Sequence, residues 1–290
     1  MQLTIRNLSK TYSNGVQALR DIDLDIPTGM YGLLGPNGAG KSTLMRTLAT
    51  LQDADSGTIT LGEIDVLRDR DAVRHVLGYL PQEFGVYQRI SAIDLLDHFA
   101  VLKGIPTDQR KAVVEALLQR TNLWDHRKKA VSSYSGGMRQ RFGIAQALLG
   151  DPQLIIVDEP TAGLDPGERN RFHNLLSSIG EHVIVILSTH IVDDVKELCP
   201  NMAIINEGKV LYAGTPDDAL HAMEGKVWKK TVAKTEVDDY QSRFGNAIIS
   251  SKLVAGKPIL HIYSTENPND GFSPVNPDLE DVFFSKIVGL

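Results

Sequence analysis

The residues best suited to chemistry form one short, glycine-rich segment. In order it reads Gly35, Pro36, Asn37, Gly38, Ala39, Gly40, Lys41, Ser42 and Thr43. It matches the pattern G-x-x-x-x-G-K-[ST], in which glycines let consecutive backbone N–H groups turn toward one anion and a following helix adds partial positive charge. Lys41 can then reach the β- and γ-phosphates of a nucleotide, Ser42 can offer its hydroxyl to Mg²⁺, and Thr43 can bond a phosphate oxygen. The segment therefore predicts a site for nucleotide phosphates.

Two neighbouring carboxylates follow an apolar run further along the chain. Residues 154–157 are all apolar, and Asp158 and Glu159 come directly after them. A carboxylate at a strand end beside a phosphate cradle suits contact with Mg²⁺, directly or through its waters, which is the role expected of Asp158. Glu159 is then placed to polarise an attacking water as a general base. A charge pair at a helix N-terminus is the structural alternative, and Pro160 makes it the weaker one.

A third segment carries two glycines where a helix is expected to begin. Ser135, Gly136 and Gly137 precede a stretch of helical character that extends to about residue 149. The first N–H groups of a helix have no partners inside the helix, so they are free to bind an anion. Taken alone, this segment fits a helix-entry turn equally well.

Short apolar runs separated by turn residues predict the elements that position these segments. Residues 3–26 are expected to form antiparallel strands, and apolar positions at helical spacing predict a helical block at about 91–149 inside an α/β domain. Glu207 and Gly208 predict the turn of a hairpin. Further strands are expected at 30–34, 58–61, 76–80, 154–157 and 183–187, and helices at 41–51, 166–179 and 191–198.

The pattern changes after residue 225. Strands are expected at 227–232, 247–254 and 258–263, followed by a helix at 277–287. These elements predict a small α+β appendage at 225–290.

Composition limits the partners. The 290 residues carry 30 basic and 36 acidic side chains, a net charge of −6, which counts against broad binding to nucleic-acid phosphates. The single cysteine, Cys199, excludes an internal disulfide and a cysteine-based zinc site, and it fits a reducing cytoplasm. Because no run approaches the ~18 apolar residues of a membrane span, any membrane role is expected to need a partner.

In this order the motifs resemble the nucleotide-binding domain of ABC (ATP-binding cassette) transporters, over about residues 1–222. The P-loop corresponds to 35–43, the signature to 134–138 and the acidic strand to 154–160. Two departures occur in the signature, where Tyr134 and Met138 replace the usual Leu and Gln. The serine and both glycines remain, so these departures do not argue against hydrolysis.

Four single residues match further motifs of the same family. Tyr12 matches the aromatic residue that stacks on adenine, and Gln82 matches the Q-loop. Asp165 matches the D-loop, and His190 matches the switch histidine. Each has a structural alternative when taken alone, namely a core aromatic, a solvated loop amide, a helix cap and a strand-end histidine. Only the ordered set favours the functional interpretation.

The resemblance implies a fold and a mechanism. The fold is an α/β P-loop NTPase (RecA-like) core with an antiparallel β subdomain, an inserted helical subdomain and the C-terminal appendage. Two chains dimerise head to tail, each ATP lying between one P-loop and the other chain's signature. The partner chain is a second copy or a closely related ATPase subunit. The implied catalytic residues are Lys41, Gln82, Glu159 and His190, and the implied Mg²⁺ contacts are Ser42, Gln82 and Asp158.

The resemblance also favours one branch of the family. The signature variant and the ending at 277–284, which contains the letters LEDVF, resemble the ATPase subunits of drug, lipid and sodium exporters. An ATPase of this kind works with a separate transmembrane permease, which places it in the cytoplasm at the inner face of the cell membrane. An importer ATPase is the nearest alternative. A soluble ATPase of DNA-repair type and a small-molecule kinase are the more distant ones.

Overall fold

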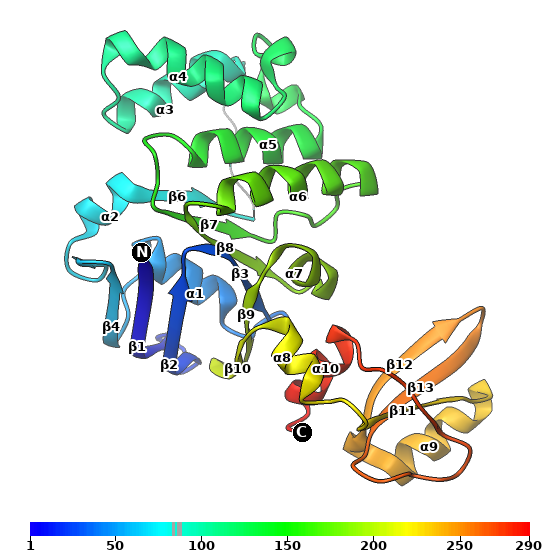
Figure 1. The fold of residues 1–290 in the computed structure, drawn as a ribbon. Coiled ribbons are helices and arrows are strands. Elements are labelled where there is room, and N and C mark those ends of the chain that lie inside the picture. The colour runs from blue at the N-terminus through cyan, green and yellow to red at the C-terminus, as the bar shows by residue number, and fades with distance from the viewer. Residues whose placement is uncertain (83–84, 86–88) are drawn as a thin grey trace.

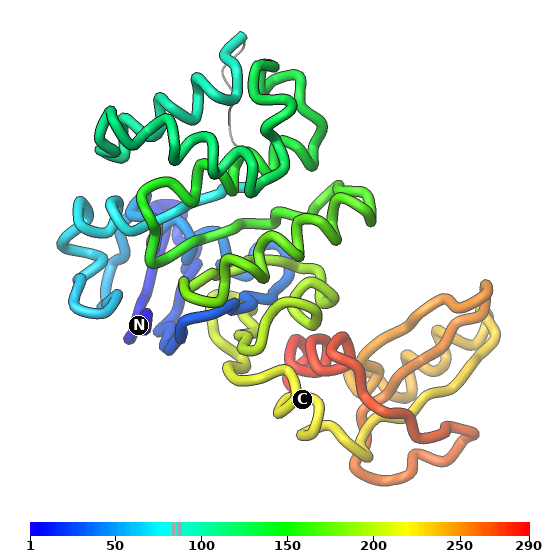
Figure 2. Tube along the Cα trace, turned by 45° about the horizontal axis from the view of Figure 1, so that its top comes forward, coloured from blue at the N-terminus to red at the C-terminus, as the bar shows by residue number. Residues whose placement is uncertain are grey.

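Three sheets and the helices packed on them make up the chain. The structure is a computed structural model that describes residues 1–82, 85 and 89–290. In both views the helical block and the C-terminal sheet lie at opposite ends of the molecule, with the larger sheet between them (Figures 1 and 2). The expected α/β class is therefore confirmed.

An antiparallel sheet forms the N-terminal part. Ile22, Leu24 and Ile26 of its second strand are buried, while the acidic residues between them are exposed. This period of two is what a sheet with one solvated face requires. The expectation of antiparallel strands at 3–26 is confirmed. The order of the strands is β2 (Gln17–Pro27), β1 (Gln2–Thr11), β4 (Ser56–Leu61) and β5 (Ile64–Asp65).

A six-stranded sheet forms the centre. Five of its strands are parallel, and β10 joins the edge as an antiparallel hairpin with β9. The parallel strands end at one common edge, so the residues that follow them meet there. The order is β10 (Lys209–Gly214), β9 (Asn201–Asn206), β3 (Gly29–Leu34), β8 (Ile184–Thr189), β7 (Leu154–Asp158) and β6 (Leu77–Leu80).

Apolar helices cover both faces of this central sheet. Leu44 of α1 (Lys41–Leu48) belongs to one buried cluster together with residues of the antiparallel sheet. Phe172 of α6 (Pro166–Gly180) belongs to the other cluster, which α7 (Val192–Leu198) also joins. Helix α1 ends at Leu48, earlier than the expected 51. The chain turns there, since Thr50 has a φ of 59°, which is left-handed backbone.

The helical block has a core of its own. Ser91 caps its first helix by accepting a hydrogen bond from the Asp94 N–H at 3.3 Å, and Leu96, Leu118 and Phe142 from three helices are fully buried together. The expected block at 91–149 is thus observed. It contains α3 (Ala92–Leu102), α4 (Thr107–Arg120), η1 (Trp124–His126), η2 (Val131–Ser133) and α5 (Gly136–Ala147).

The C-terminal part holds the expected strands and one unexpected helix. Helix α9 is amphipathic, with Val237, Tyr240 and Phe244 on the face toward the sheet. Their spacing is helical, although no helix is among the elements expected between residues 232 and 247. Short α2 (Arg70–Val76) in the core was likewise not expected. The C-terminal elements are α8 (Pro216–His221), β11 (Val227–Thr231), η3 (Lys234–Glu236), α9 (Val237–Phe244), η4 (Gly245–Ala247), β12 (Ile248–Val254), β13 (Lys257–Tyr263), β14 (Ser273–Pro274) and α10 (Leu279–Ile287).

Helix α10 joins this part to the core. Its buried residues Leu279, Val282 and Phe283 share a cluster with residues of α7 and α8. Figure 1 shows α10 lying next to α8. On its other side, Asp281 accepts a 2.8 Å hydrogen bond from His261 of β13. The division at 222–225 stays a prediction, and α10 lies where the two parts meet. Among the residues that the structure describes, no helix combines the length and the apolar character needed to cross a bilayer.

Candidate functional site

The glycine-rich segment forms a turn between β3 and α1. Gly38 and Gly40 have φ values of 81° and 108°, a region that side chains disfavour. The turn is also crowded, because a Cβ on Gly40 would collide with the backbone oxygen of Ala18 and one on Gly35 with that of Ile205. The glycines therefore let the backbone pass close to its neighbours, and the first N–H groups of α1 stay open.

A hollow of about 510 Å³ lies beside this turn. It brings together the residues of 36–43 with Tyr12, Gln82, Glu159 and His190, which are far apart in the sequence. Glu207 and Gly208 of the β9–β10 turn also line it, although their sequence indicates only a hairpin turn. A Cβ on Gly208 would lie 2.7 Å from the Ala18 oxygen, so this turn also packs closely on β2.

Lys41 is the cation of the hollow. Its side chain is 6% exposed, and its Nζ donates hydrogen bonds to the backbone oxygens of Gly35 at 2.6 Å and Pro36 at 3.3 Å. The same Nζ lies 3.5 Å from Oε1 of Glu159. Burial lowers the pKa of Lys41 from its ordinary value, and the neighbouring Glu159 opposes this shift. A phosphate that entered the turn would meet a preformed positive charge.

Glu159 lies between Lys41 and His190. It follows β7 with a φ of 49°, and its N–H donates to the Ser188 oxygen of β8 at 2.8 Å. This unusual backbone directs the carboxylate into the hollow, where Oε2 is 2.6 Å from Nδ1 of His190. The Glu159 side chain is 7% exposed and that of His190 is 48% exposed, so the histidine is the more accessible of the pair.

Asp158 lies beneath the hollow, outside the residues that line it. It is 5% exposed, and its Oδ1 has no hydrogen-bond partner within the described part of the chain. Burial raises the pKa of Asp158 above its usual value. No three His, Cys, Asp or Glu side chains gather into a metal site in residues 1–82, 85 and 89–290. An unpartnered buried oxygen fits a cation whose other ligands come from a hydroxyl and from phosphates.

Tyr12 closes the hollow at the side of the antiparallel sheet. Its hydroxyl pairs with Oγ1 of Thr43 at 3.0 Å and donates to Oε1 of Gln52 at 2.9 Å. These bonds fix the ring next to the start of α1, and stacking on a base stays a prediction.

The signature and D-loop residues lie outside the hollow. Ser135 caps α5 by accepting a hydrogen bond from the Met138 N–H at 3.2 Å, and Asp165 caps α6 by accepting one from the Glu168 N–H at 2.9 Å. Ser135, Gly136 and Asp165 are exposed. The structure thus does not bring them to the phosphate turn of their own chain.

Comparisons with known proteins identify the family. The model of the ABC transporter family matches residues 19–162. The ABC transporter ATP-binding protein NatA of Bacillus subtilis is 35% identical over 73% of this chain and 89% of its own length. The chain belongs to the ABC transporter ATP-binding family. It is accordingly a nucleotide-binding protein, and its fold is that of the ABC ATPase cassettes.

Other relatives extend this likeness. The probable multidrug ABC transporter ATP-binding protein YbhF of Escherichia coli is 31% identical over 99% of this chain, and the chain spans 52% of that relative. The daunorubicin/doxorubicin resistance ATP-binding protein DrrA of Streptomyces peucetius is 34% identical, covering 81% of this chain and 70% of its own. A solved ATP-binding subunit of an ABC transporter matches 77% of this chain and 93% of its own, with 26% identity and a TM-score of 0.69.

Proposed function

We propose that the chain is the ATP-hydrolysing subunit of an exporter and that it works through a separate transmembrane partner. The observation that carries the proposal is the Glu159 carboxylate, held 3.5 Å from Lys41 and 2.6 Å from His190 beside the phosphate turn. A general base, a phosphate-binding cation and a second polar group are thereby assembled before nucleotide enters.

Each residue has a role in this proposal. Lys41 and the N–H groups of 36–43 bind the phosphates. Glu159 takes the proton of the attacking water at its carboxylate, and His190 holds the terminal phosphate. Ser42, Asp158 and Gln82 would hold Mg²⁺, which when bound neutralises phosphate charge. Tyr12 would stack on the adenine.

A second chain completes the site in this proposal. Ser135, Gly136 and Gly137 lie at the start of α5, and none of them lines the hollow beside the phosphate turn of their own chain. A second copy, or a related ATPase subunit, would present the same segment to the nucleotide. ATP would then be part of the interface, and its hydrolysis would remove shared contacts and loosen the dimer. Asp165 at the D-loop would lie at the same interface.

An apolar groove supports the transmembrane partner. A hollow of about 410 Å³ between the core and the helical block is lined in part by Leu51, Phe99 and Leu102. Leu51 is 65% exposed and Leu102 is 70% exposed, so two apolar side chains at this groove are accessible to a partner. A permease segment bound there would hold the chain at the inner face of the cell membrane. The likeness to multidrug and drug-resistance ATP-binding proteins supports export over import, and no observation favours the nucleic-acid or kinase alternatives.

The substitution Glu159→Gln tests the proposal. Removal of the general base should lower steady-state phosphate release about 100-fold or more, while ATP binding persists and ATP traps a dimer on size-exclusion chromatography. Glu181→Gln changes an exposed carboxylate at the end of α6 and is the matched control. Phosphate release by Glu159→Gln close to that of the control would contradict the assignment of Glu159.

A further inference from the structure

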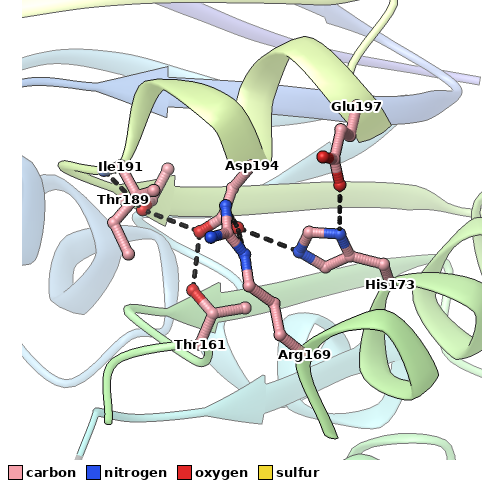
Figure 3. Close-up of polar contacts among 7 residues, drawn as sticks. All are labelled: Thr161, Arg169, His173, Thr189, Ile191, Asp194 and Glu197. Atoms are coloured by element: carbon pink, nitrogen blue, oxygen red, sulfur yellow. Dashed lines mark hydrogen bonds and ion pairs between the residues drawn. The ribbon is translucent and has the colours of Figure 1, made fainter. Parts of the chain in front are cut away.

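A fully buried carboxylate lies behind the site, in α7. Asp194 is 0% exposed, and Figure 3 shows it among side chains that lie far apart in the sequence. A buried charge is costly unless several donors satisfy it. Asp194 meets this requirement with hydrogen bonds from Thr161, Thr189, Arg169 and His173.

One oxygen of Asp194 joins the two segments that carry Glu159 and His190. Its Oδ2 accepts from Oγ1 of Thr161 at 2.6 Å and from Oγ1 of Thr189 at 3.3 Å (Figure 3). Thr161 follows Glu159 by two positions, and Thr189 directly precedes His190. The Glu159–His190 contact in the hollow therefore has a second connection beneath it.

Thr189 fixes the backbone on both sides of His190. While its hydroxyl donates to Asp194, its Oγ1 accepts from the N–H of Ile191 at 2.9 Å. Such a side-chain bond across one residue restrains the residue between its ends. The position of His190 is thus set by Thr189, and that of Thr189 by Asp194.

The other oxygen anchors helix α6. Oδ1 of Asp194 accepts from Nε of Arg169 and pairs with Nε2 of His173, both at 2.9 Å. Arg169 supplies the positive charge that offsets the carboxylate, and His173 also contacts the carboxylate of Glu197 at 2.9 Å. Both side chains come from the helix that Asp165 caps, so α6 is tied to the same point.

We infer that Asp194 is a positioning residue for the reaction, and that Thr189 and Thr161 are the groups through which it acts. This rests on the proposed hydrolysis of ATP. Asp194 holds the turn of His190 and the segment from Glu159 to Asp165 in one fixed relation to α6. The segments that carry Asp165, His190 and Glu159 are all hydrogen-bonded to the carboxylate of Asp194. A movement that a second subunit imposes on Asp165 would therefore shift His190 and Glu159 together.

The substitution Thr189→Val is the sharpest test, because valine keeps the size of the side chain and removes its hydroxyl. We expect kcat for ATP hydrolysis to fall about tenfold while KM for ATP stays within about twofold of the wild type. This pattern is expected because Thr189 positions groups that act in the chemical step and does not itself bind ATP. Thr189→Ser keeps the hydroxyl and should restore kcat to within about twofold of the wild type.

A matched control separates positioning from a general loss of stability. Thr121 is also buried, and its hydroxyl donates to the Leu117 oxygen inside the helical block at 2.8 Å. Thr121→Val makes the same chemical change away from the hollow, and it should leave kcat within about twofold of the wild type. Thermal unfolding of both valine variants shows whether they fold to the same extent.

A double substitution tests the proposed path. If Thr189 acts through Asp194, the variant carrying both Thr189→Val and Asp194→Asn should be no slower than Asp194→Asn alone. The inference is overturned if Thr189→Val turns over ATP like Thr121→Val, if Thr189→Ser loses as much activity as Thr189→Val, or if the two substitutions multiply. A wild-type chain that releases no phosphate would instead contradict the proposed hydrolysis itself.

Discussion

Two helices of this chain begin with an arrangement that suits an anion, and only one begins inside a site. Helix α1 follows Gly40 and opens into the hollow that Glu159 and His190 line. Helix α5 begins with Gly136 and Gly137, and none of its described residues lines that hollow. Ser135 and Gly136 are exposed to solvent.

The difference shows where the chemistry of one chain stops. Glu159, Lys41 and His190 lie together beside the start of α1. One chain therefore supplies all the charged side chains that the proposed hydrolysis needs. At α5 the structure offers open N–H groups without any catalytic side chain. A site that uses both helices has to take them from different chains, which is what the proposed dimer does. The predictions below test this asymmetry.

The largest effect is expected from Lys41→Ala, which removes the phosphate-binding cation at the start of α1. Loss of a buried, charge-assisted hydrogen bond to phosphate should weaken ATP binding by up to about 100-fold and abolish measurable turnover. Affinity is measured with a fluorescent ATP analogue and turnover by phosphate release. Lys111→Ala removes an exposed lysine of α4 and is the control. Unchanged affinity in Lys41→Ala would show that α1 is not the phosphate site.

A smaller and more selective effect is expected from Gly136→Ala on the α5 side. A Cβ there has open space in the single chain, its nearest contact being Cδ2 of Leu164 at 3.9 Å. Stability and ATP affinity of the separate chain should therefore be unchanged. Turnover should fall about tenfold, because the methyl group would meet nucleotide brought by another chain. Wild-type turnover in this variant would argue that no second chain approaches α5.

Mixing the two variants tests the asymmetry directly. In a head-to-tail dimer of Lys41→Ala with Gly136→Ala, one of the two sites combines an intact α1 with an intact α5. The mixture should regain a fraction of wild-type phosphate release, on the order of a quarter if pairing is random and each site works alone. A mixture that is no more active than its components would contradict shared sites.

The smallest effect concerns Asp158 and pH. Burial raises the pKa of Asp158, so the folded chain without Mg²⁺ holds this proton more tightly than the unfolded chain does. The group's contribution to stability therefore declines as pH rises through and above the ordinary value of 3.8. Asp158→Asn removes that cost, and it should raise the unfolding temperature at pH 7 by about 2–4 °C, with the gain shrinking toward pH 4. The same variant should lose the extra stabilisation that Mg²⁺ adds to ATP.

Local patterns in the sequence predicted much of the fold. The parallel strands are short apolar runs because both of their faces are buried. The glycine-rich turn is predicted by the spacing of its residues alone. Tyr12, Gln82, Glu159 and His190 were assigned through the order of motifs, and the structure brings all four to one hollow. Their individual roles stay predictions.

What the sequence did not predict depends on contacts between distant segments. Asp194 lies in an unremarkable helix, and its partners come from 161, 169, 173 and 189, so no local spacing indicates a cluster. The docking of α10 on α7 and α8 is of the same kind. Its amphipathic pattern predicts a helix with a buried face and does not say which surface covers that face.

The position of α10 has a consequence for how the chain is made. Met202, Met223 and Cys199 belong to the same buried apolar cluster as Leu279, Val282 and Phe283 of α10, and the Ser285 hydroxyl lies 3.4 Å from the sulfur of Met223. On a ribosome, these core residues are synthesised before the C-terminal sheet, and α10 is synthesised after that sheet. Until α10 is synthesised, the nascent core therefore exposes apolar surface, and folding intermediates of this kind are prone to associate. Slower translation of β11 to β14 would lengthen the exposure, and early binding of a chaperone there would protect it.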